Sequence, residues 1–291
     1  MRKWKGPSRW HYSIGIYTGD SPYELTPAAE AANPVLSRHD VTDTLAGAVA
    51  DPFLFKAEDQ WYMFVEVISQ LSWRGEIAYA SSPDGFHWKY ESLVLQEPFH
   101  MSYPYVFEWH GDIYMIPETG AAREIRLYRA SRFPDRWEHM ATLLEGERFV
   151  DTSIFRYRDS WWMYTDSGAD HMHPCLRLFS ASELQGPWTE HPASPIDADM
   201  YTGRPGGRVV LIDERPVRFT QYVTIDADDF REVNALEVLE LTASGYQERK
   251  VQPGPILAAG GQSWNAGGHH HVDPHRLDDG TWLACVDGLE R

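Results

Sequence analysis

A 19-residue phrase occurs three times in this chain, and it constrains the fold more than any other feature of the sequence. It reads VADPFLFKAEDQWYMFVEV at 49–67, MSYPYVFEWHGDIYMIPET at 101–119 and FVDTSIFRYRDSWWMYTDS at 149–167. Each copy holds an apolar run, a short polar turn and a second apolar run that ends in polar residues. The second runs begin 52 and 48 residues apart, at Trp61, Ile113 and Trp161. A period of about 50 residues in β-rich sequence is typical of propeller blades.

Each copy continues with a third strand, a turn and a tryptophan, as in GEIAYASSPDGFHW at 75–88. A more divergent fourth unit follows, and a fifth unit shows two strands before the C-terminus. The segment SIGIYTGDSPYELTP at 13–27 has the form of the strand that the fifth unit lacks. Because an open ring leaves edge strands unpaired, we predict an all-β, five-bladed β-propeller closed by N-terminal strands that join the C-terminal blade.

The length of 291 residues suits one large all-β unit. We therefore predict a single domain over 1–291. Its blades are expected at 50–96, 101–145, 149–197, 202–252, and 268–291 together with 11–27. The 12 tryptophans and 15 tyrosines favour strands and supply core packing, and exposed ones are candidates for stacking on sugar rings.

The formal net charge of −17 argues against a nucleic-acid partner and against an anionic membrane, because both need a basic face. No apolar run reaches transmembrane length, and the N-terminus lacks a signal-peptide pattern. The two cysteines, Cys175 and Cys285, exclude a disulfide framework and leave a single bridge open. We expect a cytoplasmic protein, and the residue usage suggests a bacterial source. No oligomeric state is predicted.

Two sets of polar residues recur at fixed positions of the repeat. Antiparallel pairing places the start of each inner strand beside the end of the second strand, so both sets should meet at one face of the ring. The first set is Asp51, Tyr103, Asp151, Arg204 and Asp273, and the second is Glu66, Glu118, Asp166, Gln221 and Asp287. Seven carboxylates gathered at one mouth need protonation, arginine pairing or a cation to offset their repulsion. Such a cluster is a candidate functional site, although a single repeated aspartate can equally cap a turn.

Paired carboxyl groups are the machinery of glycoside hydrolysis: one donates a proton to the leaving oxygen, and the other activates water or attacks the anomeric carbon. A further carboxylate nearby can raise the pKa of the acid. By position, Asp51 and Asp151 are the best pair, and Glu118 and Glu66 are the best acids. The residues predicted to bind substrate are Glu66, Tyr103, Asp166, Arg204, Gln221, His270 and Asp287.

The Asp-Pro of the first inner strand and the second aspartate 100 residues later resemble the five-bladed glycosidase superfamily that includes glycoside hydrolase family 43. YSIGIYTGDSPYEL, ADPFLF, SYPYVFEW, MIPE, RPGGR and HHVDPH resemble more closely the N-terminal propeller domain of glucosamine inositolphosphorylceramide transferases, which has stand-alone bacterial relatives. The family 43 pattern implies that Asp51 is the general base and Asp151 modulates the acid. Its acid is a glutamate of the fourth blade, where this sequence has Arg204 and Gln221. We therefore assign the general acid to Glu118, on the basis of its position in the repeat.

The segment GHHHVDPH at 268–275 suggests two roles. His271, Asp273 and His275 could ligate a divalent cation, calcium or zinc, beside the carboxylates. Alternatively, the histidines form hydrogen bonds that shape a sugar subsite. No cofactor is required for the predicted reaction. Arginines could pair with the carboxylates or bind an anionic substrate group such as a uronate or phosphate, and the candidates are Arg74, Arg123, Arg204 and Arg218.

We therefore predict a glycoside hydrolase that acts on a small-molecule or oligosaccharide substrate. The missing carboxylate of the fourth blade favours an alternative, a carbohydrate-binding propeller without catalysis. The histidine run favours another, a metal-dependent propeller enzyme such as a lyase or cyclase. The chain has neither a P-loop nor a G-x-S-x-G nucleophile elbow.

Overall fold

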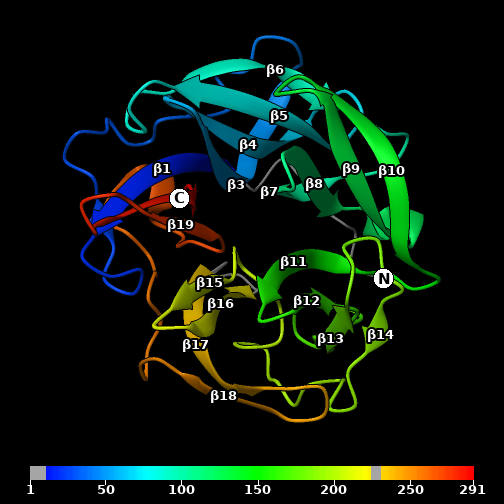
Figure 1. Cartoon of the computed structure of the whole chain (residues 1–291). Coiled ribbons are helices and arrows are strands. Elements are labelled where there is room, and N and C mark those ends of the chain that lie inside the picture. The colour runs from blue at the N-terminus through cyan, green and yellow to red at the C-terminus, as the bar shows by residue number, and fades with distance from the viewer. Residues whose placement is uncertain (1–10, 224–230) are drawn as a thin grey trace, which may run out of the picture.

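The computed structural model describes residues 11–223 and 231–291. Five four-stranded antiparallel sheets surround a central axis like the blades of a propeller, which confirms the predicted fold class (Figure 1). Three sheets are formed by consecutive strands of the first two thirds of the chain. They contain β3 (Ala46–Ala57), β4 (Gln60–Ser69), β5 (Gly75–Ser82) and β6 (Lys89–Leu95); β7 (Ser102–Trp109), β8 (Asp112–Glu118), β9 (Glu124–Arg132) and β10 (Arg136–Glu145); and β11 (Val150–Tyr157), β12 (Ser160–Asp166), β13 (Leu176–Ala181) and β14 (Thr189–Glu190).

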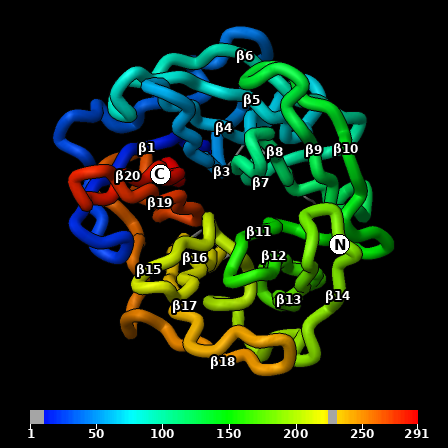
Figure 2. Tube along the Cα trace, viewed as in Figure 1, coloured from blue at the N-terminus to red at the C-terminus, as the bar shows by residue number. Residues whose placement is uncertain are grey.

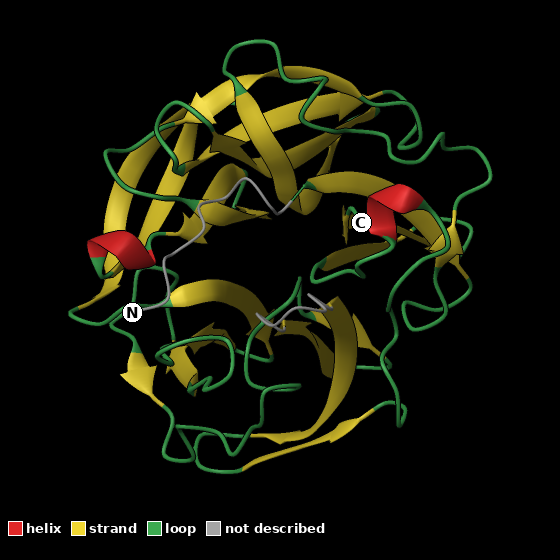
Figure 3. Ribbon diagram, turned by 180° about the vertical axis from the view of Figure 1, so that it is seen from behind, coloured by secondary structure: helices red, strands yellow, loops and turns green. Residues whose placement is uncertain are grey.

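The last two sheets complete the ring. The fourth contains β15 (Val210–Ile212), β16 (Arg215–Val223), β17 (Arg231–Leu241) and β18 (Tyr246–Lys250), and the fifth contains β19 (Val272–Arg276), β20 (Trp282–Leu289), β1 (Tyr12–Gly19) and β2 (Thr26–Pro27). Helix in the described residues is limited to two 3₁₀ turns, η1 (Gly120–Ala122) and η2 (Ser263–Asn265), which Figure 3 shows from behind. No described helix is long and apolar enough to cross a membrane.

The two ends of the described chain meet in the fifth sheet, as predicted from the segment 13–27. All eight residues of β1 pair with β20, from Tyr12 opposite Leu289 to Gly19 opposite Trp282. Figure 2 shows this meeting as a blue tube beside a red one. The pairing covers the exposed edge of β20, and β2 then pairs with β1, so the last blade reaches four strands.

The repeated tryptophan after each third strand has a structural role. The indole N–H of Trp88 donates to the carbonyl of Gly85, that of Trp137 to Pro134 and that of Trp188 to Leu184, at 2.9, 2.8 and 3.2 Å. Each tryptophan thus closes the turn that precedes the fourth strand. The rings of Trp137 and Trp188 also pack in the apolar core of the first three blades, and that of Trp88 packs against the cluster between the fifth and first blades. These tryptophans therefore stabilise the fold rather than bind sugar.

Apolar clusters fill the spaces between neighbouring blades. The largest joins the first three sheets, where the ring of Phe64 meets the edge of Trp137 at 5.5 Å between centroids. A second cluster joins the fifth sheet to the first and contains the fully buried Ile14 and Ile16 of β1. The repeat therefore buries its apolar faces blade against blade.

The seam between β1 and β20 can be tested by a core deletion. We expect Ile16→Ala to lower the free energy of unfolding by about 2–5 kcal/mol, because it removes buried apolar atoms and leaves a cavity. Denaturant unfolding followed by tryptophan fluorescence measures the change. The matched control is Leu239→Ala on β17, whose side chain is 42% exposed and which should change stability by less than about 0.5 kcal/mol. Equal losses in the two variants would contradict this packing of β1.

Candidate functional site

A cavity of about 250 Å³ lies at the face of the ring where the inner strands begin. All five sheets or the loops beside them contribute to its lining. The structure brings together seven of the predicted site residues in this lining, namely Asp51, Glu66, Glu118, Asp151, Arg204, Gln221 and His270. The charged and polar side chains that the sequence analysis did not assign to the site are Tyr12, His100, Ser102, Arg148, His171 and Arg231.

The other predicted residues lie outside the lining. They are Tyr103, Asp166, His271, Asp273, His275 and Asp287. Asp166 holds a loop, since its Oδ1 accepts the backbone N–H groups of Gly168 and Cys175 at 2.7 Å each. This is the turn-capping role that a repeated aspartate can have.

The inner strands of the first three blades share an unusual backbone feature where they reach the cavity. Asp51, Tyr103 and Asp151 have φ angles of 51°, 47° and 50°, in the left-handed region that residues other than glycine seldom adopt. Each position coincides with an irregularity in the pairing of the inner strand with its neighbour. A bulge of this kind re-aims a side chain at the rim of a barrel or propeller. It directs Asp51 and Asp151 into the cavity.

The fifth blade differs from the expected alignment. Asp273 pairs with Cys285, three residues after Trp282, as Phe53 pairs with Phe64, three residues after Trp61. Asp273 is therefore the equivalent of Phe53, deeper along the axis than Asp51. Beside the inner strand of this blade, the residue that reaches the cavity is His270, and Tyr12 of β1 lines it as well. The Asp-Pro pair at 273–274 suggested the wrong register, because it copies the Asp-Pro at 51–52.

Buried polar contacts close the axis beneath the cavity. Tyr103 is fully buried, and its hydroxyl lies 2.7 Å from the amide nitrogen of Gly207 and 2.8 Å from Ser153 Oγ, on different blades. Below it, Arg208 Nε donates to Asp273 Oδ1 at 2.7 Å. These contacts tie the second, third, fourth and fifth blades together. The cavity therefore has a floor and is open on one side only.

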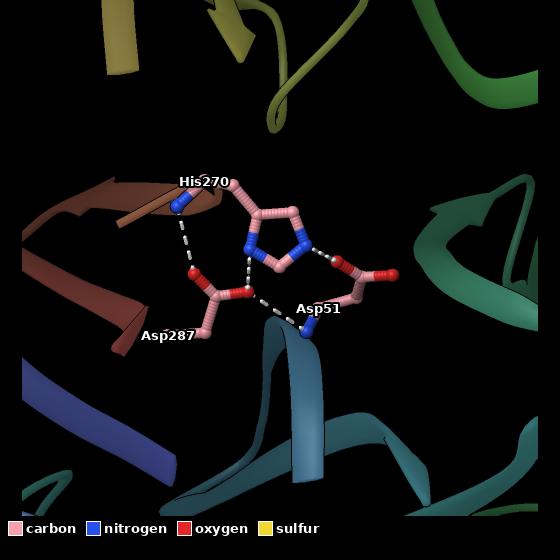
Figure 4. Close-up of side chains that lie close together, drawn as sticks. All are labelled: Asp51, His270 and Asp287. Carbon is pink, nitrogen blue, oxygen red and sulfur yellow. Dashed lines mark hydrogen bonds and ion pairs between the residues drawn. The ribbon is translucent and has the colours of Figure 1, made fainter. Parts of the chain in front are cut away.

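His270 lies between two buried carboxylates (Figure 4). Its Nδ1 is 2.7 Å from Asp287 Oδ2, and its Nε2 is 3.3 Å from Asp51 Oδ1. Burial disfavours the charged imidazole, but the negative charge of Asp287 outweighs it and raises the pKa of His270 well above its usual value. Burial also raises the pKa of Asp51, yet the hydrogen bond and charge of His270, with His271 and Arg204, lower that pKa to about 2. Asp51 is thus ionised at neutral pH.

The same three residues form the one group of potential metal ligands in the described ranges whose atoms, one from each, lie within 4.8 Å of one another. Both ring nitrogens of His270 face a carboxylate, so a divalent ion bound by these three residues would have to replace the contacts of the imidazole with Asp51 and Asp287. The expected set of His271, Asp273 and His275 does not gather its ligand atoms in this way. Asp273 is neutralised by Arg208 instead and lies 3.0 Å from His275 Nε2.

Two residues of the fourth blade form hydrogen bonds with the side chain of Asp151. Arg204 Nε donates to its Oδ2 at 2.5 Å, and Gln221 Nε2 donates to the same oxygen at 2.8 Å. Burial raises the pKa of Asp151, Arg204 lowers it, and the charges of Glu118 and Asp51 raise it again, so that it reaches about 7. The two residues that replace a fourth-blade carboxylate therefore bind the third-blade aspartate. The Oε1 atom of Gln221 is buried and has no partner among the described residues.

Glu66 and Glu118 differ in how their oxygens are used. Ser102 Oγ donates to Glu118 Oε2 at 2.8 Å. Glu66 Oε1 is buried without a hydrogen bond from a described residue; His100 Nε2 is 3.5 Å away. Burial and the charges of Asp51 and Glu118 raise the pKa of Glu66 well above its usual value. Gly75 packs so closely that an added Cβ would lie 2.2 Å from Glu66 Oε1. Glu66 is thus a fixed carboxyl group whose protonated form is favoured by burial and by the neighbouring charges.

Of the four arginines considered in the sequence, only Arg204 lines the cavity. Arg218 forms a buried pair with Glu248, and Arg74 and Arg123 donate to the backbone carbonyls of Pro98 and Gly146. Arg148 and Arg231 line it instead. The repeat could have indicated Arg148 as a lining residue, because it stands three residues before Asp151, just as His100 stands three residues before Tyr103. Arg231 begins a third strand in the most divergent blade, where no clear repeat marks it.

The fold is shared with solved glycoside hydrolases. An exo-β-1,3-galactanase from Phanerochaete chrysosporium has a TM-score of 0.64 at 12% identity, over 90% of this chain and 60% of that one. An exo-1,5-α-L-arabinanase from a bovine ruminal metagenomic library has a TM-score of 0.58 at 12% identity, over 84% of this chain and 96% of that one. At this identity the likeness establishes the five-bladed architecture.

The family follows from the sequence. Residues 6–289 match the model described as glucosamine inositolphosphorylceramide transferase 1, N-terminal, and the chain belongs to this family. A glucosamine inositolphosphorylceramide transferase 1 of Oryza sativa subsp. japonica is 33% identical over 97% of this chain. The transferase of the same name from Arabidopsis thaliana is 32% identical over 95% of this chain. The chain spans 40% and 39% of the length of these plant relatives.

The state of Glu66 predicts how stability responds to pH. A carboxyl group whose pKa is raised by folding binds more protons in the folded state, so stability falls as pH rises from its unfolded pKa to its folded one. We expect Glu66→Gln to be more stable than the wild-type protein at pH 8, with a smaller difference at pH 5, because glutamine mimics the protonated acid. The difference should grow by at most about 1.4 kcal/mol per pH unit.

Denaturant midpoints at the two pH values measure this effect. The control is Glu138→Gln, whose side chain is exposed on β10 and which should show no such trend. A Glu66→Gln variant that is less stable than the wild-type protein at both values, by the same amount, would show that the carboxylate is charged and paired in the cavity.

Proposed function

We propose that this propeller is a carbohydrate-active enzyme that hydrolyses glycosidic bonds in the cavity, with Asp51 as general base and Glu66 as general acid. The observation that carries the proposal is the opposite perturbation of these two carboxyl groups in one enclosed site. Asp51 is kept ionised by His270, while Glu66 is kept protonated by burial beside Asp51 and Glu118. Carboxyl groups with pKa values pushed apart are the arrangement that acid–base glycosidases use.

The proton donor is assigned to Glu66 rather than to Glu118, the acid inferred from position. The Oε2 atom of Glu118 accepts a hydrogen bond from Ser102. Glu66 also lines the cavity, and its buried Oε1 atom has no such partner in the described residues. A protonated carboxyl group without an internal acceptor is free to donate to the oxygen of a leaving group. Glu118 contributes by its negative charge, which helps to keep the proton on Glu66.

The reaction balances with these two groups. Asp51 takes a proton from water, the water oxygen bonds to the anomeric carbon, and the bond from that carbon to the leaving oxygen breaks. Glu66 gives its proton to the leaving oxygen. Asp51 then releases its proton to solvent and Glu66 takes one back, so one water molecule is consumed. His270 holds Asp51 in its ionised form and does not itself transfer a proton.

The floor of the cavity favours a terminal sugar as substrate. The volume of about 250 Å³ is below the roughly 300–1,000 Å³ of pockets for drug-sized ligands. With Tyr103 and Arg208 beneath it, a polysaccharide chain has no path through the ring. We therefore propose attack at the end of an oligosaccharide. No step needs a metal.

A second candidate is a carbohydrate-binding propeller without turnover. The contacts of Asp151 favour it, because Arg204 and Gln221 occupy the carboxylate that the family 43 pattern assigns to tuning the acid.

A third candidate function is glycosyl transfer, which the names of the plant relatives suggest. In that reaction a hydroxyl group of an acceptor replaces water at the anomeric carbon, and the same base and acid serve.

The test compares the wild-type protein with Asp51→Asn and Glu66→Gln on aryl glycosides and oligosaccharides, with and without EDTA. We expect each variant to lose about 10²–10⁴-fold in kcat. Because an aryl leaving group needs little proton donation, Glu66→Gln should lose less on aryl glycosides than on oligosaccharides. Glu118→Gln should lose less than Glu66→Gln on both. Glu138→Gln is the matched control, because Glu138 does not line the cavity.

Binding without release of sugar, weakened by the same substitutions, would contradict hydrolysis and favour the binding module. A product that carries the glycosyl group on an added acceptor would favour transfer. Activity lost on EDTA treatment and restored by calcium or zinc would contradict the metal-free assignment.

A further inference from the structure

Positively charged side chains gather on one side of the cavity. Arg148 approaches from the loop before β11, Arg204 from the segment before β15, and both line the cavity with His171. We propose that the sugar bound here carries an anionic group, a carboxylate or a phosphate, and that Arg148 and Arg204 bind it. The inference rests on the proposed carbohydrate function and specifies the substrate class within it.

Arg148 is the main support for this assignment. Its side chain is exposed at the cavity and makes no hydrogen bond or ion pair with any described residue. Two other pairs of charges in the site are matched: Asp51 faces His270, and Asp151 faces Arg204. An arginine that lines a cavity without an acidic partner can receive the anion of a ligand. Its planar guanidinium fits the paired oxygens of carboxylates and phosphates.

Arg204 is oriented for the same purpose. Its Nε–H donates to Asp151 and its Nη1 to Nδ1 of His171, 2.8 Å away. A guanidinium has five N–H donors, so these two contacts fix the plane of the group and leave further donors for a ligand. The fixed plane reduces the side-chain entropy that binding would cost.

The state of His171 supports the clustering of positive charge. Burial and the charges of Arg204, Arg231, His270 and Arg148 lower the pKa of His171 to about 2. The histidine is therefore neutral, and its ring nitrogen accepts from Arg204. Several cations act on one small region of the cavity wall, which is where an anionic substituent would be stabilised. The acidic groups Glu66 and Glu118 come from the first and second blades instead.

Binding of small probes tests the inference without turnover. Isothermal titration calorimetry would compare glucuronate, galacturonate and glucose 6-phosphate with glucose and galactose. We expect at least one acidic sugar to bind about tenfold or more tightly than its neutral counterpart, the equivalent of about 1.4 kcal/mol. Higher ionic strength should weaken the acidic sugar alone. Tighter binding of the uronates than of the phosphate identifies a carboxylate as the anion, and the reverse identifies a phosphate.

The decisive variant is Arg148→Gln. It should reduce the preference for the acidic sugar to about twofold or less and leave the affinity for the neutral sugar unchanged, because one charge contact of about 1.4 kcal/mol is lost. Arg136→Gln is the matched control: this arginine is exposed on β10 and does not line the cavity. Equal affinity for acidic and neutral sugars would overturn the inference. So would an equal loss for both in Arg148→Gln, or inorganic phosphate bound as tightly as glucose 6-phosphate.

Failure of this inference and failure of the proposed hydrolysis have different signatures. Tight binding of an acidic sugar with no hydrolysis of its glycosides would support the anion site and contradict the hydrolase. Hydrolysis of neutral glycosides, with no preference for acidic ones and no effect of Arg148→Gln, would support the hydrolase and contradict the anion site.

Discussion

The pairing of β1 with β20 is the interaction on which the rest of the structure depends. It closes the ring, and a closed ring is what brings the first and fifth blades into contact at the axis. At that contact the backbone N–H of Asp51 points to Asp287 Oδ2, 3.4 Å away, and His270 lies between the two carboxylates. The state of Asp51 therefore depends on residues more than 200 positions away in the chain.

Burying acids together is costly, and the cavity offsets the cost in three ways. Asp51 is stabilised by an imidazolium, Asp151 by a guanidinium, and Glu66 by retaining its proton. Each solution leaves a carboxyl group in a different state at neutral pH. The same electrostatic problem that the fold must solve thus gives three carboxyl groups of one small site different pKa values.

Much of this arrangement could be predicted from the sequence. The 50-residue repeat gives the blades, and the fixed spacing within it gives Asp51, Glu66, Glu118 and Asp151 as neighbours at one face. The register of the fifth blade could not be predicted, because the Asp-Pro at 273–274 imitates the one at 51–52 while the pairing shifts it along the axis. The choice of Glu66 over Glu118 as the proposed acid also requires the three-dimensional structure. The two residues occupy equivalent positions in the repeat and are distinguished by their hydrogen-bond partners.

The central claim is that one site holds an ionised Asp51 and a protonated Glu66. Carbon-13 NMR titration of the side-chain carboxyl groups tests it most directly, with Asp51→Asn and Glu66→Gln used to assign the two signals. The account predicts that Asp51 stays ionised to about pH 2 and that Glu66 is still protonated at neutral pH. Titration of both groups within their ordinary ranges, about 3.9 for aspartate and 4.3 for glutamate, would contradict it.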